Sequence, residues 1–193
     1  MDSTRPDGAV KAALVALSGQ RWTLAEAPLH IPPTPGLYAI YGDADAWASL
    51  GLGTSPDDRP LYVGKSESSL ADRDLRTRFG DSRTGSSTVR RSFAALLHDA
   101  LELRGIPRNP RRPERFANYG LAPDDDARLT AWMRPSLQIA AWTTTARVAL
   151  AAVEIAVLQR FKPPLNLKDV VTPWAAMVRA ARAKMAVEAS RWA

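Results

Sequence analysis

The sequence predicts an α+β fold in which three short strands are interleaved with helices. Residues that favour β-structure, bounded by glycine or arranged in alternation, indicate strands over residues 37–41, 61–64 and 136–142. Apolar residues at helical spacing, together with caps and proline stops, indicate the helices. With 193 residues, 46% of them hydrophobic, the chain is long enough to bury a core without disulfides. The predicted helices cover residues 8–17, 69–79, 88–105, 145–161 and 173–192.

Each predicted strand has a local cause. The first, LYAIY, lies between Gly36 and Gly42 and follows HIPPTPG, which is rigid and extended because each proline fixes φ and restricts the residue before it. The second, LYVG, ends at Gly64. The third, SLQIAAW, alternates apolar and polar side chains, as expected for a half-buried strand.

The helices are bounded by recognisable signals. Ser68 or Ser69 caps the helix that ends near Phe79, and Ser87 caps the helix that ends at Gly105. Residues 106–115 contain three prolines and therefore predict an irregular segment. A single helical turn is expected over residues 129–132, and Pro163-Pro164 stops the helix that begins near Thr145.

The composition excludes several classes of site. The chain has no cysteine and only two histidines, which excludes thiol nucleophiles, cysteine-based zinc clusters and disulfides and disfavours a multi-histidine metal centre. No apolar run approaches the roughly 18 residues that span a bilayer, and the first residues, MDSTRPDG, lack a signal-peptide layout. We therefore expect a cytoplasmic protein with no membrane partner.

The charge is compatible with a nucleic-acid partner. The chain carries 26 Lys and Arg against 20 Asp and Glu, a net charge of +6, and 21 of the basic residues are arginines. The guanidinium fork matches the geometry of phosphate oxygens. A GC-rich coding sequence would enrich arginine and alanine in the same way, so composition alone leaves the two explanations equal.

One acidic residue stands in an unusually apolar helix. Every residue from Val148 to Leu158 is apolar except Glu154. Burial of an unpaired carboxylate costs several kcal/mol, on the order of the desolvation penalty of one ion. Either Glu154 is solvated or pairs with Arg147 or Arg160, or it faces a cation in a site. Without histidine or cysteine partners, the cation that fits is a hard one such as Mg²⁺, which keeps several waters.

Three segments together resemble the GIY-YIG nuclease family. The first two motifs of that family stand here as Gly36-Leu37-Tyr38 and Tyr62-Val63-Gly64, and Lys65-Ser66 follows the second. Glu154 then lies on a later helix, and an asparagine, Asn166, follows it by twelve residues. The resemblance implies a small three-stranded, mainly antiparallel sheet flanked by helices, with an added C-terminal helix and an active site on one sheet face.

The resemblance also implies a role for each matching residue. Glu154 holds a divalent ion, Mg²⁺ or Mn²⁺, and Tyr38 accepts the proton of the attacking water. A free tyrosine has a pKa near 10, so positive charge must favour deprotonation, and Lys65 supplies that charge or contacts phosphate. Tyr62 positions the scissile phosphate or the water, and Asn166 orients Glu154 or a phosphate oxygen.

Two departures from the family pattern matter. The tyrosines lie 24 positions apart, so residues 42–60 look like an insertion. The phosphate-clamping arginine of the family lies on the helix after the second motif, where this chain has three candidates. Arg78 flanks the apolar face of the predicted helix and is preferred. Arg73 fits the usual distance from the glycine better but points away, and Arg76 ranks third.

Two basic segments are further candidates for DNA contact. A Gly/Ser loop joins a helix N-terminus in RTGSSTVRR, which offers backbone N–H groups and guanidinium groups to a phosphate. The proline-rich segment after Gly105 predicts a flexible DNA-contacting loop. The alternatives are a plain capped helix and a solvated linker. The candidate residues are Arg83, Ser87, Arg90, Arg91, Arg108, Arg111 and Arg112.

These observations predict a metal-dependent DNA endonuclease of the GIY-YIG type. We expect an N-terminal helical extension over residues 1–30, the nuclease domain over 31–168 and a basic C-terminal helix over 169–193, packed on the domain. The oligomeric state stays open, a homodimer being one option. The alternatives are a non-catalytic nucleic-acid-binding module that keeps the fold and a protein that docks partners through exposed Trp174 and Trp192 on the last helix.

Overall fold

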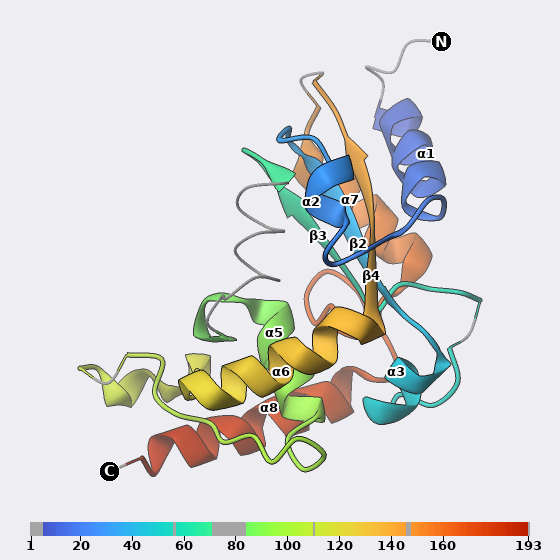
Figure 1. Cartoon of the computed structure of the whole chain (residues 1–193). Coiled ribbons are helices and arrows are strands. Elements are labelled where there is room, and N and C mark those ends of the chain that lie inside the picture. The colour runs from blue at the N-terminus through green and yellow to red at the C-terminus, as the bar shows by residue number, and fades with distance from the viewer. Residues whose placement is uncertain (1–5, 56, 71–83, 110, 146–147, 193) are drawn as a thin grey trace.

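A four-stranded antiparallel sheet forms the centre of the computed structural model, which describes residues 6–55, 57–70, 84–109, 111–145 and 148–192 (Figure 1). The strand order is β1-β4-β2-β3. The strands are β1 (Trp22–Thr23), β2 (Gly36–Gly42), β3 (Tyr62–Ser66) and β4 (Leu137–Thr143). The helices are α1 (Pro6–Leu17), α2 (Ala27–His30), α3 (Ala44–Ser49), α5 (Thr88–Leu96), α6 (Pro123–Ser136), α7 (Leu150–Phe161) and α8 (Ala175–Ser190), with 3₁₀ turns η2 (Thr84–Ser86) and η3 (Pro113–Asn118).

The sheet confirms the three predicted strands and adds a fourth. The expectation of three strands is wrong because β1 pairs with β4, Trp22 opposite Ile139 and Thr23 opposite Gln138. Two residues are too few to show an alternating pattern, so the sequence carries no readable signal for this strand. Since β1 lies within the predicted N-terminal extension, that segment contributes to the sheet itself.

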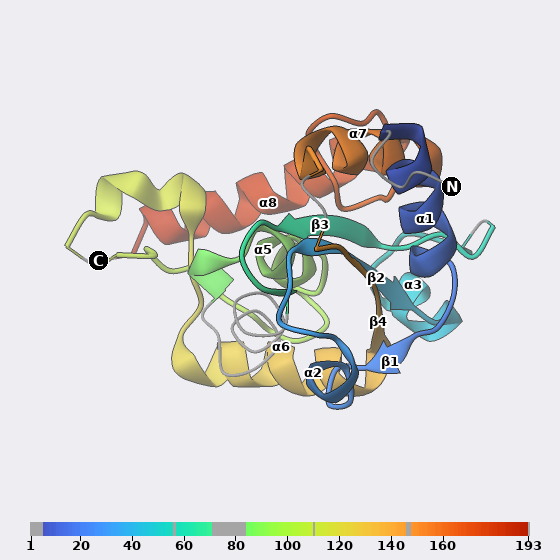
Figure 2. The same cartoon turned by 90° about the horizontal axis from the view of Figure 1, so that it is seen from above.

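The two faces of the sheet are covered by different helices. Along β2, side chains alternate between the faces, so Leu37 and Ala39 pack on one side and Tyr38 and Ile40 on the other. Helices α1 and α7 cover the first face. The second face packs on a larger core, which takes in residues of α5, α6 and α8, and these three helices lie together in the lower part of Figure 1. Figure 2 shows α7 and α6 on opposite sides of the strands.

Several helix boundaries differ from the sequence prediction. Helix α5 ends at Leu96 rather than near Gly105, and the chain then turns, with Glu102 in the left-handed region at φ 50°. Helix α6 is longer than the predicted single turn, because Pro123 and three aspartates form a favourable first turn. Helix α7 begins at Leu150, five residues after the predicted start.

The predicted phosphate clamp falls outside the part of the chain that the structure describes. Most of the helix expected over residues 69–79 lies there, and with it Arg73, Arg76 and Arg78. Arg83 lies there as well. The roles expected of these four arginines therefore stay predictions from the sequence.

One side of helix α8 packs into the core of the domain. Val178, Met185 and Ala189 are buried, and a Cβ atom on Gly105 would collide with the Met185 carbonyl oxygen. The indole of Trp174 donates to the Leu52 carbonyl oxygen at 3.0 Å, whereas Trp192 is exposed. Among the helices in the described ranges, none combines the length and apolar composition that a bilayer-spanning helix requires.

The beginning of α5 is built around a buried arginine. The Arg90 side chain is fully buried, and its Nη2 donates to Thr130 Oγ1 at 2.9 Å and to Asp126 Oδ1 at 3.1 Å. Arg91 is also buried and donates to the Gly85 carbonyl oxygen at 2.8 Å, while the Ser87 side chain caps the helix. The structure therefore contradicts the prediction that Ser87, Arg90 and Arg91 contact DNA, because all three side chains are buried and form hydrogen bonds within the protein.

We expect Arg90→Ala to lower the free energy of unfolding by about 3 kcal/mol, because removal of one partner leaves the poorly solvated Asp126 carboxylate without its counter-charge. Urea denaturation followed by circular dichroism measures the change. The exposed Arg111 provides the control, and Arg111→Ala should alter stability by less than about 0.5 kcal/mol. Equal effects of the two changes would show that the buried pair does not hold α5 to α6.

Candidate functional site

The two motif tyrosines lie on the same face of the sheet. Tyr38 is opposite Gly64 and Ile40 is opposite Tyr62 in the β2–β3 pairing. The centroids of the Tyr38 and Tyr62 rings are 6.1 Å apart. The Tyr38 ring is fully buried and lies over Gly64, where a Cβ atom would come within 2.6 Å of the Tyr38 hydroxyl oxygen. The second motif therefore needs glycine at this position to make room for the tyrosine of the first.

The chain after α7 closes the free edge of β3. The helix ends at Lys162, which is left-handed with φ 49°, and the two prolines that follow direct the chain along the strand. The Leu165 N–H donates to the Leu61 carbonyl oxygen at 3.0 Å. The Asn166 side chain then accepts from the Val63 N–H at 2.9 Å and donates to the Val63 carbonyl oxygen at 2.8 Å. An amide side chain thus takes the place of a neighbouring strand.

This geometry gives Asn166 a structural role that the sequence did not predict. The side chain is buried, and the hydrogen bonds that it forms with described residues both join it to the Val63 main chain. It therefore fixes β3 against the end of α7, and no hydrogen bond between described residues joins it to the Glu154 carboxylate. The expected contact with a phosphate oxygen stays a prediction. The consequence for the site is indirect, because the Asn166 amide and the Leu165 N–H together hold the strand that carries Tyr62 against the segment that follows the helix of Glu154.

Glu154 lies half-buried on α7, beside the edge strand. Among the described residues, its carboxylate forms no hydrogen bond and no ion pair. Burial raises the pKa of Glu154 above the ordinary glutamate value, and Asp169 adds to that rise. Lys65 and Lys168 oppose it, since their positive charges favour the ionised form. The apolar sequence around Glu154 had left open a pair with Arg160 or Arg147: no ion pair joins Glu154 to Arg160, and Arg147 lies outside the described residues.

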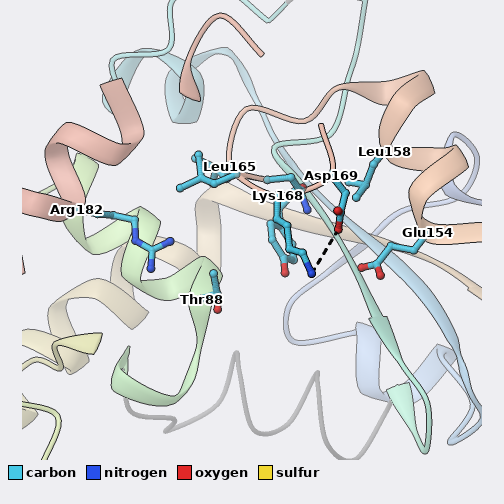
Figure 3. A pocket seen from close by; sticks show the side chains of 10 residues that line it. Thr88, Glu154, Leu158, Leu165, Lys168, Asp169 and Arg182 are labelled. Carbon is cyan, nitrogen blue, oxygen red and sulfur yellow. Dashed lines mark ion pairs between the residues drawn. The ribbon is translucent and has the colours of Figure 1, made fainter. Parts of the chain in front are cut away.

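A pocket of about 370 Å³ opens in front of Glu154 (Figure 3). Figure 3 shows the Glu154 carboxylate on one side of this pocket and the Arg182 guanidinium on the other, with Lys168 and Asp169 between them. The lining residues come from β3, α5, α7, α8 and the segment after α7: Tyr62, Thr88, Glu154, Leu158, Leu165, Asn166, Leu167, Lys168, Asp169 and Arg182.

Lys65 lies on the opposite face of the sheet from Tyr38. It is opposite Leu37 in the pairing of the strands, and both residues belong to the face covered by α7. Its Nζ is 2.8 Å from Glu67 Oε1, and this hydrogen bond raises the pKa of Lys65. The expectation that Lys65 assists deprotonation of Tyr38 therefore does not fit the structure. Its charge instead lowers the pKa of Glu154.

The sequence prediction found some of the pocket and missed the rest. Tyr62, Glu154 and Asn166 line the pocket. The buried Tyr38 does not line it, and its ring packs beside the Tyr62 ring. Arg108, Arg111 and Arg112 are exposed and do not line it.

Lys168, Asp169, Thr88 and Arg182 were not predicted. The sequence signal for that turn is the pair of charged residues, Lys168 and Asp169, shortly after Asn166. In the structure, Asp169 is left-handed at φ 63°. Nothing in the sequence separates Arg182 from the other basic residues of the last helix.

Comparison with known proteins agrees with this geometry. A family model described as the GIY-YIG catalytic domain matches residues 51–184, more than half of the chain. The chain belongs to the GIY-YIG family. Proteins of this family are generally nucleases and are typically metal-dependent. The matched range contains Tyr62, Glu154, Asn166 and Arg182 and begins after Tyr38. No curated protein and no solved structure matches the chain.

The donor groups of this GIY-YIG site fit a hard divalent ion. Within the described ranges, no group of three or more acidic or histidine side chains is arranged to hold a metal. Mg²⁺ does not need such a group, because it retains several waters and takes one or two carboxylates. The Glu154 carboxylate, open to a pocket, supplies that kind of ligand.

We expect Asn166→Ala to destabilise this GIY-YIG domain by about 2 kcal/mol, because the Val63 N–H and carbonyl groups lose their partners. Hydrogen exchange of the Val63 amide, followed by NMR, should accelerate together with this loss. Asn118→Ala, at an exposed position of η3, serves as the control and should change neither quantity. Unaltered protection of Val63 in Asn166→Ala would contradict the proposed closure of the β3 edge.

Proposed function

We propose that this protein is a metal-dependent endonuclease that hydrolyses phosphodiester bonds of DNA. The observation that carries the proposal is the half-buried Glu154 carboxylate, which has no partner among the described residues and lies in a pocket that also contains Tyr62. A buried acid without a partner is unfavourable in the protein alone and favourable beside a cation. The net charge of +6 supports a polyanionic substrate.

Each residue of the site has a task in this reaction. Glu154 would hold Mg²⁺ or Mn²⁺, which when bound polarises a phosphate and assists the leaving oxygen. Tyr62 lines the pocket and positions the scissile phosphate or the water. Tyr38 accepts the proton of the water, as the family resemblance implies. Arg78, with Arg73 as the alternative, clamps the non-bridging oxygens. Asn166 acts through β3, which it holds in place.

The alternative function is a non-catalytic nucleic-acid-binding module on the same fold. Such a module would bind DNA in a salt-sensitive manner without cleaving it. The environment of Glu154 argues against this alternative, since a binding module gains nothing from a desolvated carboxylate that repels phosphate. The two functions separate cleanly by experiment, because only the nuclease depends on a divalent ion.

We expect Glu154→Gln to reduce plasmid nicking in Mg²⁺ by at least about a hundredfold, because the amide carries no charge to hold the ion. Mn²⁺ binding, measured by calorimetry, should be lost in parallel. Glu114→Gln makes the same chemical change at an exposed position of η3 and should leave both measurements unchanged. Nicking by Glu154→Gln at the wild-type rate would refute the metal assignment, and binding without nicking by the wild type would favour the non-catalytic module.

We expect Tyr38→Phe to lower the nicking rate by about 10²-fold or more, the usual contribution of a general base. Tyr62→Phe should raise KM more than it lowers kcat, because the hydroxyl positions substrate at the pocket surface. Tyr119→Phe is the matched control, since this tyrosine donates to the Arg91 carbonyl oxygen and lies outside the pocket lining. Full activity in Tyr38→Phe would show that another group accepts the proton.

A further inference from the structure

We propose that Arg182 of α8 binds a second phosphate of the DNA strand, next to the one that is cleaved. This inference rests on the proposed function and adds a substrate-positioning site to it. Arg182 and Glu154 line the same pocket, and Figure 3 shows them on opposite sides of it. When one phosphate of a DNA strand lies at Glu154, a neighbouring phosphate can lie at the Arg182 guanidinium group.

The Arg182 side chain has no acidic partner in the described part of the protein. It forms no hydrogen bond and no ion pair there, whereas Lys184 on the same helix pairs with Asp99 at 3.0 Å. Its charged neighbours include Arg91, whose pKa is lowered first by burial and then by the Arg182 charge. Arg108 acts on Arg91 in the same direction. Guanidinium groups gathered in this way favour an anion between or beside them.

Thr88 supplies a second donor on this side of the pocket. Its Oγ1 accepts a hydrogen bond from Arg91 Nη2 at 3.3 Å, so the hydroxyl proton is directed elsewhere. Among the described residues, no acceptor takes that proton, and Thr88 lines the pocket beside Arg182 (Figure 3). The buried Arg91 therefore contributes by orienting Thr88, while Arg182 and Thr88 face the ligand.

The two sides of the pocket differ in charge: Glu154 and Asp169 are acidic, with Lys168 beside Asp169, and Arg182 is basic. When no metal ion is bound, the Glu154 and Asp169 carboxylates repel a phosphate. The Arg182 guanidinium group attracts a phosphate without any ion. The phosphate to be cleaved thus lies at the acidic side, where Glu154 would hold the ion, and a neighbouring phosphate lies at the basic side.

The test measures binding of a short DNA duplex to the full chain in EDTA, where cleavage is absent. We expect Arg182→Ala to raise Kd about tenfold and to reduce the slope of log K against log salt by about 0.9, the loss of one phosphate contact. Arg182→Lys keeps the charge and should recover part of the affinity. Arg191→Ala removes the same charge about 13 Å further along the helix axis and should change Kd less than about twofold.

Kinetics in Mg²⁺ give a second readout. Arg182→Ala should raise KM and leave kcat within about twofold, since the residue holds a phosphate that does not react. An unchanged Kd, an unchanged salt slope or an equal effect of Arg191→Ala would overturn the proposal, as would a loss confined to kcat. If wild-type protein binds DNA but never nicks it, the proposed function fails, and the EDTA binding data still decide the role of Arg182.

Discussion

The arrangement of the site depends on how the free edge of β3 is closed. An edge strand exposes unpaired N–H and carbonyl groups, and here the Asn166 amide satisfies both groups of Val63. Because Asn166 follows α7 after a short turn, the same contact fixes the end of that helix against the strand. Tyr62 and Glu154 meet at one pocket as a result. The Asn166 side chain thus helps to place Tyr62 and Glu154 at the same pocket through its hydrogen bonds to the main chain.

The second constraint is electrostatic. Glu154 is desolvated enough for its pKa to rise, and the charges around it are mixed, with Lys65 and Lys168 opposing Asp169. Both lysines have a nearer acidic neighbour, since Lys65 Nζ is 2.8 Å from Glu67 Oε1 and Lys168 Nζ is 3.9 Å from Asp169 Oδ2. The carboxylate therefore keeps an unmet preference for a cation. Under the proposed function, a bound divalent ion would meet that preference, and this would account for an acid within the apolar run from Val148 to Leu158.

The sequence predicts what local patterns encode and fails where tertiary contacts decide. The β2, β3 and β4 strands follow from alternation and flanking glycines, and Glu154 stands out because its neighbours are apolar. Strand β1 is two residues long and forms only because β4 offers it an edge. The side of the pocket that contains Thr88 and Arg182 joins α5 to α8, which are far apart in the sequence. No local pattern reports that proximity.

Sequence context is a poor guide to which arginines of this chain are available to a ligand. Arg90 and Arg91 stand in the sequence context that best suits a phosphate, a Gly/Ser loop before a helix, yet both are buried and bonded within the protein. The guanidinium fork that suits phosphate suits carboxylates, hydroxyls and main-chain carbonyls equally well. What distinguishes Arg182 is the lack of any such partner among the described residues, together with its place in a pocket. Unpaired charge at a concave surface, and not the number of basic residues, identifies the side chains that are available to a polyanion.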